Sequence, residues 1–113
     1  MRCPTTSTNS GETQCLGFIT IAHIDDYDYE KSLDLGGYRD SYLNLKRGFP
    51  ILRRNYVVRL ETFGDCCWEI YSEYKFSGDK QVLWPGGFTN PDFQPASMRR
   101  MECNFVQNKT YPF

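Results

Sequence analysis

The chain has 113 residues, 16% of them aromatic, and a formal net charge of −1 at pH 7. This length suits one domain with a modest hydrophobic core, and the aromatic content argues against disorder. The near-neutral charge excludes a general nucleic-acid-binding protein, which needs a basic excess. No apolar run is long enough for a transmembrane helix. We therefore expect a folded domain with no nucleic-acid partner and no transmembrane segment.

The first residues differ in composition from the rest. Residues 1–14 are rich in Thr, Ser, Asn and Gly, and we expect an N-terminal arm in front of a domain that spans residues 15–113. No signal peptide is visible, because Met1 leads directly into polar residues, and we interpret the sequence as a mature form. A sequon for N-glycosylation begins at Asn108, as in proteins that follow the secretory route.

From Gly17 onward, short β-prone runs alternate with turns that contain Gly and Pro. This spacing, without a long stretch of 3.6-residue apolar periodicity, predicts an all-β sandwich or barrel. One short helical turn is expected around residues 40–45, and residues 104–113 are expected to form a surface tail. The expected strands are Phe18–Ile24, Ser32–Leu35, Tyr56–Thr62, Cys67–Tyr71, Lys80–Trp84 and Ser97–Cys103.

The chain also contains an internal repeat. Residues 56–62 match residues 97–103 in pattern, and residues 18–29 can be aligned with residues 67–78. Two copies of about 40 residues, each with about four strands, predict a pseudo-twofold β structure. The first motif would span residues 17–62, and the second would span residues 66–103.

The second copy carries two aromatic residues, a glycine and a serine at a characteristic spacing, namely Tyr71, Phe76, Gly78 and Ser97. This pattern resembles the Greek-key motif of the βγ-crystallin family, which implies a sandwich of two Greek-key motifs. In such a motif the glycine takes a positive φ, the two rings pack across a folded hairpin, and the serine hydroxyl satisfies a backbone group of that hairpin. Trp68 is expected to point into the core because side chains alternate along a strand.

The first copy is degenerate. Ala22 stands at the first aromatic position, Tyr27 at the second, Tyr29 at the glycine and Tyr56 at the serine. Without the glycine and the serine, the first hairpin is expected to close in a different way.

Five cysteines, none of them in a C-x-x-C pair, and a single histidine argue against a zinc knuckle and favour disulfides. Cys66 and Cys67 are adjacent strand residues that do not bond to each other easily. We expect Cys103 to pair with one of them, and Cys3 and Cys15 to hold the arm. The full connectivity stays open, and the odd cysteine could join two chains into a disulfide-linked homodimer.

The resemblance raises the question of calcium, because many microbial and invertebrate βγ-crystallins bind Ca²⁺. The stretch before the last strand begins with an aspartate and ends with a serine, but Phe93 and Ala96 between them depart from the family's calcium motif. The equivalent stretch of the first copy has two arginines and no carboxylate, which disfavours a cation. We expect no resident cofactor, with one degenerate Ca²⁺ site as the weaker alternative. Its candidate ligands are Asp92, Ser97, Asp25 and Asp26.

An acidic run begins at the same aspartates. Asp25, Asp26, Asp28 and Glu30 lack the glycine spacing of an EF-hand loop, and we expect an exposed polar hairpin there.

Few residues are suited to catalysis. His23 is the only histidine and lies in an apolar run, which favours a strand position over a role as general base. Glu69 and Glu73 are interpreted as ordinary strand and hairpin residues. No Gly-x-Ser-x-Gly elbow and no phosphate-binding loop are present. We expect a protein that is not an enzyme.

Basic residues recur at equivalent places of the two motifs, and a stripe of them would bind an anionic glycan or a membrane surface. Exposed aromatic rings at Tyr38, Tyr42, Phe88 and Phe93 would favour that activity. The candidate residues for an anionic ligand are Arg53, Arg54, Arg99 and Arg100.

The sequence thus predicts a secreted, disulfide-stabilised, βγ-crystallin-like protein with a structural or binding role. One alternative is a defence or toxin-like module that binds membranes or glycans. The other is a protease inhibitor that presents the loop Pro91–Ala96.

Overall fold

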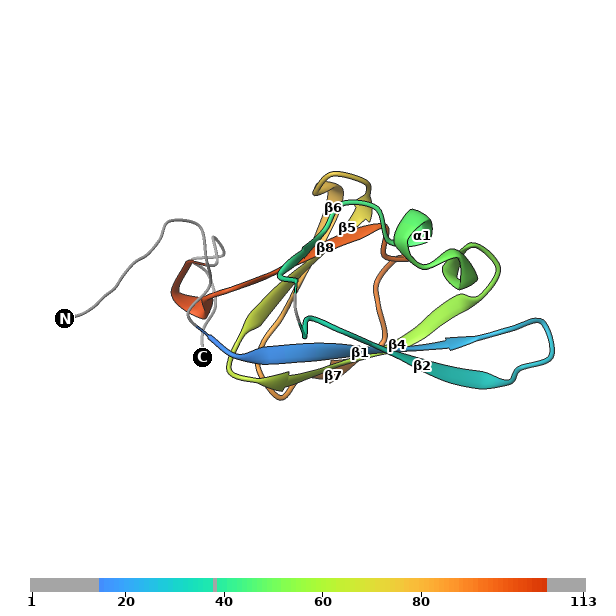
Figure 1. Ribbon diagram of the computed structural model, residues 1–113, viewed down its shortest axis with the longest axis horizontal. Helices are drawn as coiled ribbons and strands as arrows, with labels where there is room; N and C mark the ends of the chain where they lie inside the picture. Colours follow the sequence, from blue (N-terminus) through green and yellow to red (C-terminus); the bar gives the residue numbers. More distant parts are fainter. Residues whose placement is uncertain (1–14, 38, 106–113) are drawn as a thin grey trace.

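The computed structural model describes residues 15–37 and 39–105. They form an all-β sandwich of two four-stranded antiparallel sheets, which confirms the predicted fold class (Figure 1). The strands are β1 (Gly17–Ile24), β2 (Glu30–Leu35), β3 (Ser41–Tyr42), β4 (Tyr56–Gly64), β5 (Cys67–Glu73), β6 (Ser77–Leu83), β7 (Phe88–Thr89) and β8 (Ser97–Met101). The first sheet has the order β2-β1-β4-β7, and the second has the order β3-β8-β5-β6.

The two halves of the chain have the same connectivity. β1 pairs with β2 and with β4, and in the second half β5 pairs with β6 and with β8. The fourth strand of each half therefore returns to lie beside the first, as in a Greek key. The short third strands are exchanged, because β3 pairs with β8 and β7 pairs with β4. Each half completes the sheet of the other, so the two halves form one folding unit.

The hydrophobic core lies between the two sheets. Ile19 and Ile21 of β1 and Trp68 and Ile70 of β5 belong to one apolar cluster, and all four side chains are fully buried. The alternation along β5 therefore directs Trp68 inward, as predicted. Burial of a large apolar side chain stabilises the folded state by about 1.5–3 kcal/mol.

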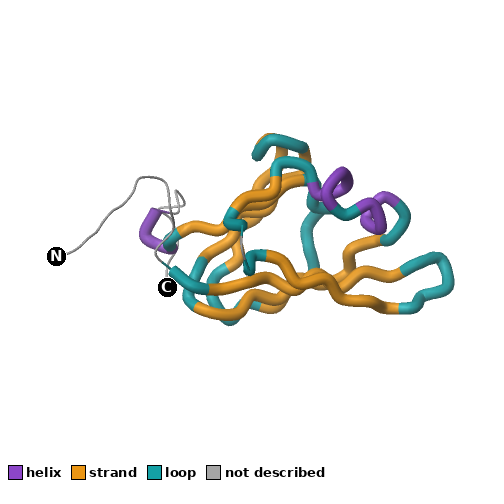
Figure 2. Tube along the Cα trace, in the orientation of Figure 1, coloured by secondary structure: helices purple, strands orange, loops and turns teal. Residues whose placement is uncertain are grey.

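The connection from β3 to β4 is more helical than the sequence predicted. Where one turn was expected at residues 40–45, residues 41–42 form β3, and α1 (Leu45–Gly48) begins after Asn44. The Asn44 Oδ1 atom accepts a hydrogen bond from the Arg47 backbone at 3.0 Å, so this cap sets the helix start later than expected. Pro50 then starts the 3₁₀ helix η2 (Pro50–Arg53). Figure 2 shows both helical segments at the end of the sandwich where the β1–β2 hairpin turns.

The β5–β6 hairpin folds as the spacing of its residues led us to expect. Gly78 has a φ of +82°, and the rings of Tyr71 and Phe76 lie 5.7 Å apart. The fully buried Ser97 hydroxyl donates to the Glu73 carbonyl at 2.6 Å and accepts from the Phe76 amide at 3.0 Å. One hydroxyl on β8 therefore satisfies two backbone groups of the folded hairpin.

The β1–β2 hairpin closes in a different way, as expected for the degenerate copy. The Asp25 Oδ1 atom accepts hydrogen bonds from the backbone amides of Tyr27 at 2.8 Å and Tyr29 at 3.1 Å. Asp28 takes the left-handed conformation with a φ of +64°, which aspartate tolerates better than most residues. The hairpin stays straight, and its tip projects at one end of the long axis of the molecule (Figure 1).

Candidate functional site

A cleft of about 290 Å³ lies between the tip of the β1–β2 hairpin and the connection from η2 to β4. The hairpin contributes Asp25, Asp26, Tyr27 and Lys31, which supply two carboxylates, a phenol and an ammonium group. The volume of the cleft is close to the lower bound of about 300 Å³ for small-molecule sites, so the cleft suits a ligand of monosaccharide size.

The opposite wall of the cleft comes from Ile51, Arg54 and Asn55. Asn55 is buried, and its amide nitrogen donates to Nδ1 of the buried His23 at 2.9 Å. Because an amide nitrogen can only donate, the imidazole proton lies on Nε2. Burial and, to a smaller extent, the nearby charge of Lys31 hold the pKa of His23 below its ordinary value of 6.5. A neutral histidine therefore holds the cleft-lining amide in place.

The chemistry of the cleft is mixed in charge. Lys31 and Arg54 offer donors, and the two aspartates offer acceptors, although one oxygen of Asp25 already binds the backbone of the turn. Tyr27 also lines the cleft, and it is 82% exposed. This set of donors, acceptors and one aromatic ring suits an uncharged or zwitterionic molecule rich in hydroxyl groups.

Sequence reasoning missed a second cluster, on the outer face of the second sheet. Glu69 was expected to be an ordinary strand residue, but it is only 1% exposed. Its carboxylate accepts from Arg99 Nε at 2.9 Å, from Lys80 Nζ at 3.3 Å and from the Tyr71 hydroxyl at 2.7 Å. The Arg99 guanidinium lies 4.9 Å from the centre of the Phe76 ring. Both cations come from other strands, Lys80 from β6 and Arg99 from β8, so the sequence around Glu69 on β5 gave no signal for this ion pairing.

The hydrogen bonds in this cluster determine the charge of its members. Burial by itself would raise the pKa of Glu69, but hydrogen bonds from Tyr71 and Arg99 and the charge of Lys80 outweigh it and lower that pKa. Burial and the adjacent carboxylate raise the pKa of Tyr71 to about 12. At neutral pH the charge of Glu69 is therefore balanced within the cluster by Lys80 and Arg99.

The structure does not bring the four candidate arginines into one stripe. Arg99 is engaged with the buried carboxylate, and Arg100 points to the opposite face of β8. Arg54 lines the cleft, and the Arg53 Nε atom donates to a backbone carbonyl of α1 at 3.2 Å. Alternation along β8 separates Arg99 from Arg100, so Arg54 is the member that faces the candidate site.

Two of the four aromatic residues whose exposure would favour ligand binding pack wholly or partly against the core. Tyr42 is 6% exposed, and its hydroxyl accepts from the Gly36 amide at 2.8 Å. Phe93 is partly buried against the core. Phe88 is exposed, whereas Tyr38 lies outside the described residues. Tyr42 and Phe93 therefore do not meet the condition of full exposure, because β3 and the loop before β8 both close over the core.

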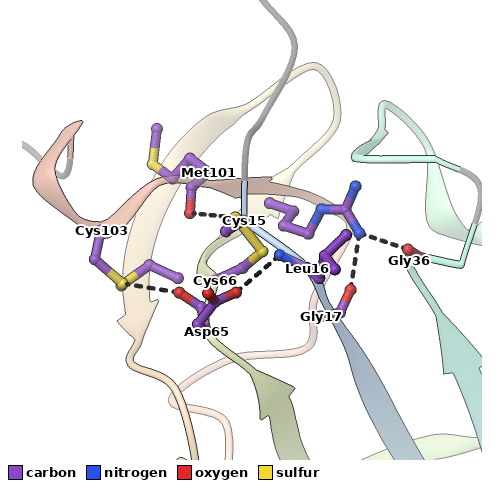
Figure 3. Close-up of a disulfide and its surroundings, with 10 residues drawn as sticks. Cys15, Leu16, Gly17, Gly36, Asp65, Cys66, Met101 and Cys103 are labelled. Carbon is purple, nitrogen blue, oxygen red and sulfur yellow. Dashed lines mark hydrogen bonds between the residues drawn. A yellow bond between two sulfur atoms is a disulfide. The ribbon is translucent and has the colours of Figure 1, made fainter.

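Two disulfides join residues from both ends of the described chain to the adjacent cysteines at the start of β5, and Figure 3 shows the surroundings of the first. Cys15 bonds Cys66, and Cys67 bonds Cys103. The adjacent cysteines thus bond to different partners, and Cys103 pairs with one of them as expected. Cys103 begins the 3₁₀ helix η3 (Cys103–Phe105), so β8 ends before the cysteine that was expected to close it. The fifth cysteine, Cys3, lies outside the described residues.

Backbone contacts surround the first disulfide (Figure 3). The Asp65 carboxylate accepts from the Leu16 amide at 2.8 Å, and Arg100 donates to the carbonyls of Gly17 at 2.8 Å and Gly36 at 2.6 Å. Within residues 15–37 and 39–105, this disulfide and Asp65 are the one compact group of three potential metal ligands. Two of those ligands are bonded to each other, so the group does not offer a set of free metal donors.

The candidate calcium ligands lie in different places. The Ser97 oxygen serves the β5–β6 hairpin, and one Asp25 oxygen serves the β1–β2 turn. Asp92 lies in the loop before β8, where its backbone amide donates to the side chain of Gln81 at 3.0 Å. In the described part of the chain, Asp25, Asp26 and Asp92 do not form a compact group of ligands. The glycosylation candidate Asn108 lies outside that part.

The loop Pro91–Ala96 is packed against the body of the protein. The Gln94 side chain accepts from the Val57 amide at 2.8 Å and donates to the Val57 carbonyl at 3.0 Å. Pro95 and Ala96 are buried. Most of this loop is therefore held against the protein, and Asp92 is its exposed residue.

No model of a known protein family matches the chain, and no curated protein matches it either. No helix among the described residues is long and apolar enough to cross a membrane.

Proposed function

We propose that the chain is a secreted, non-catalytic binding module of βγ-crystallin-like type, and that it holds a saccharide unit in the cleft at the tip of its first hairpin. The two disulfides support an extracellular location, because such bonds persist in oxidising compartments. The exchanged third strands and the contacts of Ser97 and Gly78 support the Greek-key resemblance.

The observation that carries the binding proposal is the convergence of polar groups in the cleft. Tyr27 and Arg54 come from different loops, and each loop is held in place by buried or backbone hydrogen bonds. A site that is ordered before binding loses less entropy when its ligand arrives. Sugar hydroxyls both donate and accept, so they match a site that contains carboxylates beside cations.

The mixed charge also decides between ligand classes. Asp25 and Asp26 lie beside the two cations of the cleft and oppose a strongly anionic surface such as a phospholipid membrane. A non-catalytic function agrees with the position of His23, because this histidine is buried and its Nδ1 atom accepts a hydrogen bond from Asn55. A neutral or zwitterionic glycan is therefore the ligand class that this site favours.

An array of neutral, uronic-acid-containing and sulfated oligosaccharides, followed by titration calorimetry, tests the proposal. The protein for this test is refolded with its disulfides formed and carries no other modification. We expect Tyr27→Ala and Arg54→Ala each to weaken the best ligand at least about tenfold, which is about 1.4 kcal/mol. Tyr74→Ala is the matched control, because Tyr74 is an exposed tyrosine that does not line the cleft.

Two results would overturn this assignment. One is an array on which no saccharide binds, and the other is binding that both cleft variants leave unchanged. Binding to anionic phospholipid vesicles at low salt, without saccharide binding, would favour the membrane-directed defence module instead.

A further inference from the structure

The tip of the first hairpin presents two phenol groups to solvent. Tyr27 is 82% exposed and Tyr29 is 68% exposed, the highest values among the tyrosines that the structure describes. Both residues lie between β1 and β2, outside the strands themselves, at the projecting end of the molecule (Figure 1). A second protein can therefore reach both hydroxyl groups without disturbing the sandwich.

Acidic residues flank both phenols on each side. Asp26 and Asp28 are the neighbours of Tyr27, and Asp28 and Glu30 are the neighbours of Tyr29. Glu30 forms an ion pair with Arg59, whereas Asp26 and Asp28 are exposed. The tip therefore carries its negative charge directly beside the two hydroxyl groups.

Other exposed tyrosines provide an internal comparison. Tyr56 is 60% exposed and lies between Asn55 and Val57, so it has no acidic neighbour. Tyr74 is 44% exposed and lies between one acidic and one basic residue. Exposure alone is therefore common in this chain, and the combination of exposure with acid on both sides belongs to the tip.

We propose that Tyr27 and Tyr29 are sites of tyrosine O-sulfation. A transferase with a basic groove binds an acidic, protruding segment by charge complementarity. The transferred group comes from an activated sulfate donor of the phosphoadenosine phosphosulfate class. The phenolic oxygen forms a new bond to sulfur, the bond between sulfur and the donor's phosphate oxygen breaks, and the phenolic proton passes to a base of the transferase.

This inference rests on the secretory part of the proposed function, because the tip must meet the transferase on that route. It does not rest on the cleft, and Tyr29 does not line the cleft. The consequence for the molecule is a fixed negative charge on each modified ring. An ester of this kind stays ionised at physiological pH, so the acidic tip becomes more strongly anionic.

The test uses the full chain, expressed behind a cleavable secretory leader in animal cells fed with radioactive inorganic sulfate. The secreted protein is treated with a glycosidase that removes N-linked glycans, digested with a protease and mapped by mass spectrometry. We expect label in the peptide that contains residues 25–30, and tyrosine sulfate after alkaline hydrolysis. The radioactive sulfur also distinguishes a sulfate ester from a phosphate ester, because the two esters have nearly the same mass.

Matched substitutions make the assignment specific. In the double variant Tyr27→Phe and Tyr29→Phe, we expect at least a tenfold loss of protein-bound label, because the hydroxyl groups are absent. The double variant Tyr56→Phe and Tyr74→Phe should keep the label of the unaltered chain. The proposal would be overturned if the glycosidase removed all of the label from the secreted protein. It would also be overturned if the label lay at Tyr56 or Tyr74. Such a result leaves saccharide binding untouched, because that binding is measured on unmodified protein.

Discussion

At the scale of single residues, the charge state of His23 is tied to its burial. The imidazole is 3% exposed, and its Nδ1 atom accepts a hydrogen bond from Asn55. A proton on Nδ1 would remove that acceptor and would add a charge near Lys31. The folded state therefore prefers the neutral form, in agreement with the lowered pKa.

This preference predicts a loss of stability with falling pH. Below the ordinary pKa of 6.5, the unfolded chain binds a proton at His23 and the folded chain does not, so the free energy of unfolding decreases. The loss is about 1.4 kcal/mol for each pH unit by which the folded pKa lies lower. Urea denaturation between about pH 7.5 and about pH 5 measures it, and this window lies above the range in which Glu69 gains its proton.

The single imidazole also allows a direct check by NMR. A His23 resonance that titrates at or above 6.5 would contradict the prediction, because the folded state would then lose no stability on protonation. His23→Gln is the control, and its unfolding free energy should vary less over the same pH range.

At the scale of elements, the β5–β6 hairpin depends on a hydroxyl from another strand. We expect Ser97→Ala to lower the free energy of unfolding by about 1–3 kcal/mol, because the Phe76 amide and the Glu73 carbonyl both lose their partner. Urea denaturation measures the effect. Ser32→Ala, at an exposed serine of β2, is the control and should change stability by less than about 0.5 kcal/mol. Equal stability of the two variants would show that the hairpin does not need the hydroxyl.

At the scale of the whole molecule, the two disulfides tie both ends of the described chain to the start of β5. Cys67 and Cys103 are 36 residues apart, and the other pair is 51 residues apart. Loop-closure entropy varies with the logarithm of loop length, so each bond should stabilise the fold by a similar amount of about 3–4 kcal/mol.

Removal of one disulfide tests this estimate. We expect Cys67→Ala with Cys103→Ala to lower the free energy of unfolding by about 3–4 kcal/mol in urea without reductant. The unaltered protein treated with reductant should lose more, because both bonds are then open. A loss below about 1 kcal/mol in the double variant would mean that the packing between the sheets, and not the covalent bond, holds this end together.

Much of the fold could be predicted from neighbours along the chain. Short β-prone runs and turn residues predicted the sandwich, and the spacing of Gly78, Tyr71 and Phe76 predicted a folded hairpin. These features depend on backbone sterics and on alternation along a strand, which operate over a few residues. The missing glycine likewise predicted a different closure for the β1–β2 hairpin, although not that Asp25 would provide it.

The candidate site could be predicted only in part. The acidic hairpin was expected to be exposed, but nothing in the local sequence placed Arg54 and Asn55 beside it. That contact follows from the pairing of β1 with β4, in which Ile24 lies opposite Tyr56. The burial of Glu69 likewise depends on β8, which supplies Arg99 from 30 residues away.

The sequence by itself determined the all-β class, the motif of the second hairpin and the presence of an acidic tip. The tertiary structure alone decided which cysteines bond, which arginine faces the cleft and which tyrosines reach solvent. The physical reason is the range of the interactions involved. Turn and strand preferences act between neighbouring residues, whereas partners across strands depend on a register that is set by packing of the whole sandwich.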